Sequence, residues 1–275
     1  MKFKIIGSGG SVSLPKPLCR CPVCVEARTK GKPYSRYGCS IYLSDIKLLI
    51  DTPEDIGVAL NNSDVVSIEN LAYTHWHPDH TMGMRVIEQL QQDWLQHSLG
   101  IEDAGNALSL YLSSFSKDEI MAISSKYGSF IEYYMNMNLV KLSVIKECTY
   151  IGDIKVSTIE SGVKGITIFL FEQNDKKVIY APCDAKPFPL VSEFYNADLL
   201  IIGSTFPSAT LKNNFEVTAK NPMLKDYFLL DEVIALKKQL NISELIITHL
   251  EEDYGLSYAD YLRTEKDYEH LKFAY

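Results

Sequence analysis

The chain has 275 residues, of which 46 % are hydrophobic and 23 % are charged, values typical of a soluble globular protein with a core that needs no disulfides. No run of about 18 consecutive apolar residues occurs, so we expect no membrane contact, and without a targeting segment we expect a cytoplasmic protein. The formal net charge of −8 argues against a broad nucleic-acid-binding surface.

The first half of the chain alternates strand and helix signals. A first strand is predicted by "KFKII", and a tight turn by "GSGGS". Residues 13–38 contain four prolines and three clustered cysteines, and they predict a long irregular loop. Two strands are predicted by "CSIYLS" and "KLLIDT", with a turn at 44–46. Further on, we expect a helix over 54–61, a short strand in "IENLAYTH", a helix over 82–97 and a strand over 108–113.

The second half repeats this theme. Residues 154–160, 166–172 and 177–181 predict three successive strands, and a short helix is expected near 188–196. Buried strands are predicted by "ADLLIIGST" and "ELIITH", with a helix between them in "MLKDYFLLDEVIALKKQL". A last helix is expected around 257–267. Two packed sheets flanked by helices suit this order, and no linker divides the chain, so we expect one α/β domain over 1–275.

Three of the six histidines lie within six residues, in "THWHPDH". His75 and His77 are two apart, so they share one face of an extended segment. Pro78 then fixes a turn, which lets Asp79 and His80 point back at the same space. Imidazole nitrogen and carboxylate oxygen are ligands that zinc prefers, and two pairs of ligands on one loop suit two adjacent metal ions.

These residues resemble a known family. The stretch "HWHPDH" is similar to the HxHxDH motif of the metallo-β-lactamase superfamily, whose fold is an αββα four-layer sandwich of two mixed sheets flanked by helices. Other matches follow in order, namely "IIGSGGSVSLP", "LLIDTPEDI", "VIYAPCDA" and "ELIITHLEED". They cover about residues 3–84 and 153–252, and the helical segment at about 85–150 is where that family varies.

The resemblance implies a ligand set. His75 and His77 would belong to a first metal site, and Asp79, His80 and His249 to a second. Asp184 would bridge both. In hydrolases of this family a bridging hydroxide attacks phosphorus or a carbonyl carbon, with Asp184 holding the metals and Asp79 also orienting the hydroxide.

The chain departs from the family where most members supply a third histidine to the first metal. The corresponding stretch, "STIESGVKGITIFLFE", contains none. Glu160 could substitute, because a carboxylate is a competent ligand, or it could be a solvated charge at the end of a strand. We therefore expect one firmly held zinc or manganese ion in the second site and partial occupancy of the first.

Cys19, Cys21 and Cys24 have a spacing that lets three thiolates converge on one zinc ion. Such a zinc would pin the loop at 13–38. The trio resembles PhnP-like cyclic phosphodiesterases and PqqB proteins, in which a later histidine completes the zinc site. Glu252 stands at that position here, and Glu252, Asp253 or a non-protein ligand could complete it.

The leading hypothesis is a metal-dependent hydrolase that acts on a small, phosphate-containing substrate, such as a cyclic phosphodiester or nucleotide. The alternatives are a PqqB-like protein with a non-hydrolytic or cofactor-handling role, and a metal- or nucleotide-binding protein with a degenerate first site. The sequence leaves a homodimer open.

Overall fold

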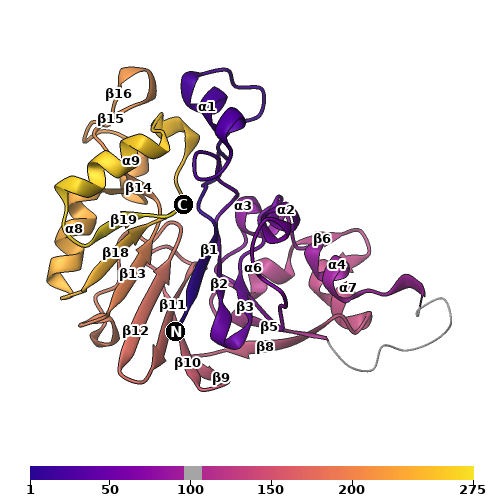
Figure 1. The fold of residues 1–275 in the computed structure, drawn as a ribbon. Helices are drawn as coiled ribbons and strands as arrows, with labels where there is room; N and C mark the ends of the chain where they lie inside the picture. The colour runs from indigo at the N-terminus through magenta and orange to yellow at the C-terminus, as the bar shows by residue number, and fades with distance from the viewer. Residues whose placement is uncertain (96–106) are drawn as a thin grey trace.

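The computed structural model describes residues 1–95 and 107–275, and its strands form two large mixed sheets (Figure 1). The first sheet contains, in spatial order, β1 (Phe3–Gly7), β2 (Ser40–Leu43), β3 (Leu48–Ile50), β4 (Asn70–Tyr73), β5 (Leu108–Ser113) and β8 (Val140–Ile145). The second contains β19 (Leu271–Phe273), β18 (Glu244–Ile247), β13 (Leu199–Ile202), β12 (Lys176–Ala181), β11 (Thr167–Gln173), β10 (Ile154–Glu160) and β9 (Cys148–Ile151).

Each sheet changes from antiparallel to parallel pairing part-way across. In the first sheet β1, β2 and β3 pair antiparallel, and β3, β4, β5 and β8 pair parallel. In the second sheet β9 to β12 pair antiparallel, and β12, β13, β18 and β19 pair parallel. Parallel neighbours place their carboxyl ends at one edge, where the loops after β12, β13 and β18 meet.

Side chains of alternate residues build separate cores on the two faces of each sheet. In β11, Ile168 and Leu170 pack in the core beneath the C-terminal helices, whereas Phe169 and Phe171 pack in the core between the sheets. This alternation follows from the period of two along a strand.

Helices cover the outer face of each sheet. The core outside the first sheet includes residues of α2 (Ile56–Asn61), α4 (Val86–Gln91), α6 (Lys117–Met121) and α7 (Phe130–Asn136). The core outside the second sheet includes residues of α8 (Leu230–Gln239) and α9 (Tyr258–Thr264). The four-layer α/β sandwich predicted from the sequence is confirmed (Figure 1).

Short elements complete the described chain. Two-residue strands pair as β6 (Ser124–Ser125) with β7 (Gly128–Ser129), β14 (Thr205–Phe206) with β17 (Phe228–Leu229), and β15 (Thr210–Leu211) with β16 (Phe215–Glu216). Single 3-10 turns are η1 (Ser44–Ile46), η2 (Ser192–Phe194), η3 (Lys212–Asn214), η4 (Pro222–Lys225), η5 (Glu252–Tyr254) and η6 (Glu265–Asp267).

The structure differs from the sequence predictions in several segments. The loop predicted over 13–38 contains the helix α1 (Pro22–Lys30), because Pro22 stands at a helix start, where its missing N–H is tolerated. The segment 85–150, expected to be helical apart from the strand over 108–113, also supplies the strands β6 to β9. The helix expected near 188–196 is only the turn η2, since Pro187 and Pro189 precede it.

Two further helices are shorter than their periodic patterns suggested. The helix predicted over 82–97 is α4, and residues 96 and 97 lie outside the described part of the chain. The helix expected in 223–240 begins only at Leu230, because the segment before it forms η4 and the strand β17. Apolar residues there pack through strand pairing with β14, which local periodicity does not encode.

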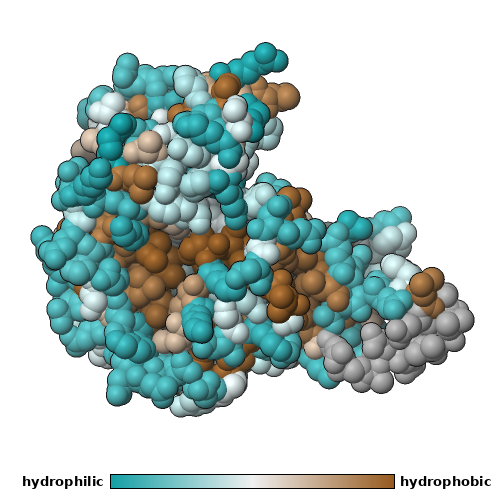
Figure 2. Space-filling model, viewed as in Figure 1, coloured by the Kyte–Doolittle hydropathy of each residue, from teal (hydrophilic) through white to brown (hydrophobic). Residues whose placement is uncertain are grey.

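The surface in Figure 2 is mostly hydrophilic at the margins of the view, and hydrophobic side chains gather near its middle, over the strands. Within residues 1–95 and 107–275, no helix is long and apolar enough to span a membrane.

Candidate metal centres

Three histidines converge after β4. This strand ends at Tyr73, and Pro78 is the first residue of the short helix α3 (Pro78–Thr81). The ring centroid of His75 lies 4.4 Å from that of His77 and 4.3 Å from that of His80. His75 and His80 are buried, and His77 is half-buried. The turn at Pro78 therefore brings the histidines of the motif to one place.

Two residues of the second sheet complete this cluster. Cys183 follows β12, and His249 follows β18, with its ring stacked 5.3 Å from that of His80. Potential ligand atoms of His75, His77 and Cys183 all lie within 4.8 Å of one another. The same limit holds for His80, Cys183 and His249. Cys183 is thus common to both groups, and we call these five side chains the central cluster.

The buried histidine rings are held in fixed orientations. His75 Nδ1 lies 2.9 Å from Thr74 Oγ1, and His80 Nδ1 lies 2.8 Å from Asp51 Oδ2. Asp51 also accepts hydrogen bonds from the Thr74 backbone N–H and hydroxyl, both at 2.8 Å. The opposite atoms, Nε2 of His75 and His80, are buried without a hydrogen-bond partner. A ring that is anchored through one nitrogen and open at the other is the arrangement of a metal-binding histidine, so these residues fit a metal ion.

Charge in the central cluster also favours a cation. Burial disfavours a charged His80, but the Asp51 carboxylate raises the pKa of His80 well above its usual value. Burial raises the pKa of the Cys183 thiol, but the His249 and His75 rings outweigh burial and hold that pKa well below its usual value. His75 has a lowered pKa because of its burial, and neutral imidazole is the form that binds metal.

The predicted aspartates flank this cluster. Asp79 Oδ2 lies 3.1 Å from His249 Nε2 and 3.5 Å from His80 Nε2. Burial alone would raise the pKa of Asp79, but these two rings lower it to about 2. Asp184 Oδ2 lies 3.8 Å from His77 Nδ1, and neither of the two groups that share Cys183 includes Asp184. Burial and the neighbouring Cys183 raise the pKa of Asp184 to about 6.

Sequence reasoning missed the role that geometry gives to Cys183. It assigned the shared position to Asp184, the next residue along the chain, whereas the buried thiol belongs to both groups of converging ligand atoms. A signal was available, because the thiol immediately precedes that aspartate at the end of a predicted strand. The strand β12 ends at Ala181, and Asp184 has a positive φ of 42°, so strand alternation does not decide which of the two side chains faces the cluster.

Glu160, a predicted substitute ligand, has another partner. Its carboxylate accepts a hydrogen bond at 3.0 Å from the backbone N–H of Gly165 and closes the loop between β10 and β11. No group of three potential ligands among the described residues includes Glu160. Ser161, the next residue, donates to the Asp184 carbonyl at 3.1 Å, so this loop supports the aspartate through its backbone.

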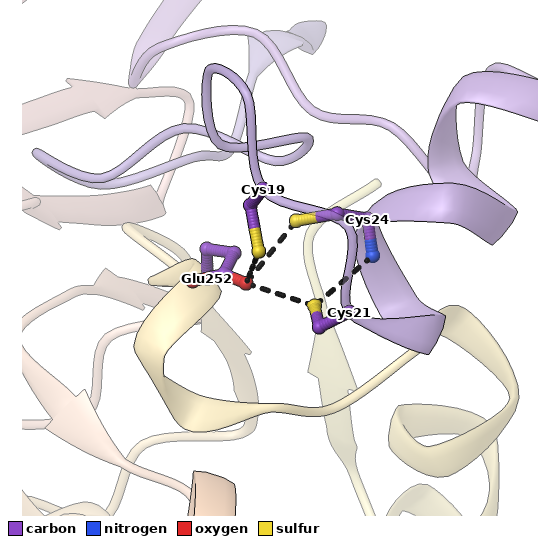
Figure 3. Close-up of side chains that lie close together, drawn as sticks. All are labelled: Cys19, Cys21, Cys24 and Glu252. Carbon is purple, nitrogen blue, oxygen red and sulfur yellow. Dashed lines mark hydrogen bonds between the residues drawn. The ribbon is translucent and has the colours of Figure 1, made fainter.

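The three clustered cysteines point toward Glu252 (Figure 3). Glu252 Oε1 lies 3.1 Å from the sulfur of Cys24, 3.2 Å from that of Cys21 and 3.6 Å from that of Cys19. The four ligand atoms lie within 4.8 Å of one another, as the predicted zinc site requires. Lys212 also contacts the Glu252 carboxylate, and it helps to lower the pKa of Glu252 to about 2 although burial opposes this.

Asp253, the other protein ligand considered for this zinc, pairs with Lys16 at 3.4 Å at the surface. It is absent from the group of converging ligand atoms.

A cavity of about 320 Å³ opens beside the central cluster. Its walls include polar side chains of the candidate site together with residues of the segment before β17. They are Ser11, His77, Asp79, Cys183, Asp184, Met223, Asp226, Tyr227 and His249. No lysine or arginine lines this cavity in the described part of the chain. Bound metal ions would therefore be the main source of positive charge for a substrate.

No protein-family model matches the chain, and no curated protein matches it. Solved structures do match. A diphosphatase of the PhnP family is 18 % identical with a TM-score of 0.69, over 99 % of this chain and 94 % of that one. Zn²⁺-bound PqqB from Methylobacterium extorquens is 17 % identical with a TM-score of 0.73, over 100 % and 98 %.

A third match names the fold. YhfI from Bacillus subtilis, a metallo-β-lactamase fold protein, is 14 % identical with a TM-score of 0.61, over 99 % of this chain and 95 % of that one. Sequence identities this low support a shared fold and nothing further. The chain has the metallo-β-lactamase fold, as its histidine motif predicted.

Proposed function

We propose that the protein is a metal-dependent hydrolase that cleaves a small phosphodiester. The observation that carries this proposal is the central cluster, in which Nε2 of His75 and His80 are buried without hydrogen-bond partners and both residues have Cys183 among their neighbouring potential ligands. Buried polar atoms without a partner are costly, and a metal ion would satisfy them. The likeness to a diphosphatase of the PhnP family adds support at the level of the fold.

Each group of side chains has a task in this proposal. A bound divalent metal ion would lower the pKa of water and stabilise negative charge on a phosphoryl oxygen. The histidine pairs His75–His77 and His80–His249 would hold metal through their imidazole nitrogens. Asp79, close to both rings of the second pair, can orient a water molecule by accepting its hydrogen bond at Oδ2.

The cavity favours a phosphodiester over a phosphomonoester. A phosphodiester carries one negative charge at neutral pH, whereas a monoester carries nearly two. Asp184 and Asp226 line the cavity, and no described lysine or arginine compensates them. The cavity volume of about 320 Å³ is at the lower end for small-molecule sites, which agrees with a substrate the size of a nucleotide or smaller.

Hydrolysis of bis(4-nitrophenyl) phosphate in the presence of Zn²⁺ or Mn²⁺ tests the proposal. We expect turnover by the wild-type protein and a loss of about 100-fold or more in the Asp79→Asn variant, which keeps the size of the side chain but removes its charge. Cys148→Ser, an exposed position on β9, serves as the control and should keep full activity.

Metal binding without turnover would overturn the hydrolase proposal. That outcome would favour the second candidate, a PqqB-like non-hydrolytic or cofactor-handling role. The observation in its favour is that the loop at 160–165 supplies no histidine, and that Glu160 bonds to its own loop.

A further inference from the structure

We propose that the Cys183 thiolate is the ligand shared by two metal ions, in the place where a carboxylate was expected, and that Asp184 is part of the cavity wall. This inference rests on the metal-binding part of the proposed function and not on hydrolysis. It assigns a role to a buried thiol that the proposed reaction leaves unused.

The distances allow one sulfur to serve both histidine pairs. Zinc binds nitrogen at about 2.1 Å and sulfur at about 2.3 Å, so two such ligand atoms on one ion are at most about 4.4 Å apart. The ligand atoms of each group lie within 4.8 Å of one another without an ion, so small rotations of the side chains would suffice. His75 and His77 would bind one ion, and His80 and His249 the other, with Cys183 between them.

The backbone after β12 holds the thiol in this place. The Asp184 N–H donates to Ser204 Oγ at 2.9 Å, and the Asp184 carbonyl accepts from Ser161. On the other side, Gly203 lies so close that a Cβ there would meet the Pro182 carbonyl oxygen at 1.6 Å. The segment is therefore packed closely on both sides, which holds Cys183 toward the central cluster.

A shared thiolate also supplies what the first site lacks. Without the third histidine of the family pattern, His75 and His77 alone would hold a metal ion weakly. Cys183 gives this pair a third ligand atom, so we expect both sites to be filled. Because thiolate is a soft ligand, the centre should prefer zinc or cobalt over manganese.

Cobalt substitution tests the inference without reference to activity. Thiolate bound to Co²⁺ gives a charge-transfer absorption in the near ultraviolet, and the three-cysteine site contributes to it as well. The informative quantity is therefore the difference spectrum between the wild-type protein and Cys183→Ser, in which that contribution cancels. Cys39→Ser removes another buried thiol, which lies 3.6 Å from Tyr180 and Thr248 hydroxyls, and is the matched control.

We expect a thiolate band in the Cys183→Ser difference spectrum, none for Cys39→Ser, and at least a tenfold weaker binding of cobalt by Cys183→Ser. Cys183→Asp should bind metal without the thiolate band. This variant replaces Cys183→Ser in the difference spectrum if the serine variant does not fold. In the zinc-loaded wild-type protein, X-ray absorption should detect more zinc–sulfur bonds than Cys19, Cys21 and Cys24 provide.

An unchanged spectrum in both Cys183 variants, or a sulfur count explained by the three-cysteine site alone, would overturn the inference and leave the hydrolase proposal standing. A thiolate band that depends on Cys183, in a protein that does not hydrolyse phosphodiesters, would support the inference and contradict the hydrolase proposal. Cys183 would then be a ligand, and the proposed reaction would be wrong.

Discussion

Glu251 connects His249 to the turn that follows the first strand. Its Oε1 lies 3.3 Å from His249 Nδ1, and its carboxylate accepts hydrogen bonds from the backbone N–H groups of Ser11 at 3.1 Å and Val12 at 2.7 Å. The contact with Nδ1 is an ion-pair distance and not a hydrogen bond, and a carboxylate placed behind a metal-binding histidine favours one orientation of the ring. The glycine-rich turn of β1 therefore has a task at the site through Glu251.

Gly10→Ala should disrupt this connection. A Cβ at Gly10 would lie 2.1 Å from Glu251 Oε1 and 2.7 Å from His249 Nδ1, so both side chains would have to move. We expect at least a tenfold weaker binding of metal, measured by competition with a chelator. Gly57→Ala is the control, because its Cβ would meet only Gln89 at 3.5 Å and alanine favours the helix α2. Equal metal affinities of the two variants would contradict this reading of the turn.

Asp51→Asn tests whether the orientation of His80 matters. The asparagine is isosteric but lacks the charge that holds the His80 ring through Nδ1 at 2.8 Å. We expect a 10- to 100-fold loss of metal affinity, the range found for residues behind metal ligands. Asp64→Asn removes an exposed partner of Lys4 and should leave affinity unchanged. Calorimetric titration of the metal-free proteins measures the metal affinity of both variants. Equal affinities of Asp51→Asn and Asp64→Asn would argue against the role of Asp51.

Cys24→Ser should remove the zinc ion of the three-cysteine site. Cys24 is buried, and its sulfur lies 3.1 Å from Glu252 Oε1, so its loss leaves too few ligands for a structural zinc. Mass spectrometry under native conditions should show about one metal ion fewer per chain. Thermal unfolding should show a lower melting temperature, because zinc binding contributes to folding. Cys148→Ser should keep the wild-type metal content. A full metal content in Cys24→Ser would refute the zinc assignment.

Asp79 should make the stability of the metal-free protein depend on pH. Its pKa of about 2 lies below the value of about 3.9 in an unfolded chain, so it stabilises the fold above about pH 4. This stabilisation, roughly 2 kcal/mol, is lost as the pH falls from 4 toward 2. Urea unfolding with chelator should show a wild-type advantage over Asp79→Asn at pH 5 that disappears near pH 2. A difference that is constant across this range would show that the charge of Asp79 is not stabilising.

Much of the fold could be predicted because the strands carry their own pattern. The strand β5 (Leu108–Ser113) spans the residues predicted for it, and short apolar runs such as β13 (Leu199–Ile202) mark strands that are buried on both faces. The small parallel pair β14 with β17 could not be predicted, because Thr205 and Phe228 are joined by tertiary packing across a long loop. The pattern of apolar residues in a short stretch of sequence does not encode such long-range contacts.

The candidate site also contains residues that could be predicted from the sequence and one that could not. His75, His77, His80 and His249 could be found because each follows a strand in a recognisable order. The choice between Cys183 and Asp184 could not, because both follow the end of β12, where Asp184 has a positive φ of 42° and the alternation of a strand no longer applies. That choice depends on Ser204 and Gly203, which pack against this segment from a different strand.

The central cluster takes His75, His77 and His80 from the first sheet's side and Cys183 and His249 from the second. Occupancy of the site is thus thermodynamically linked to the docking of the two sheets. At a free metal concentration 100 times the dissociation constant, an ion that binds only the folded state stabilises it by about 2.7 kcal/mol. In a cell that limits zinc, the supply of metal would then set how much of this protein survives proteolysis as well as how much of it is active.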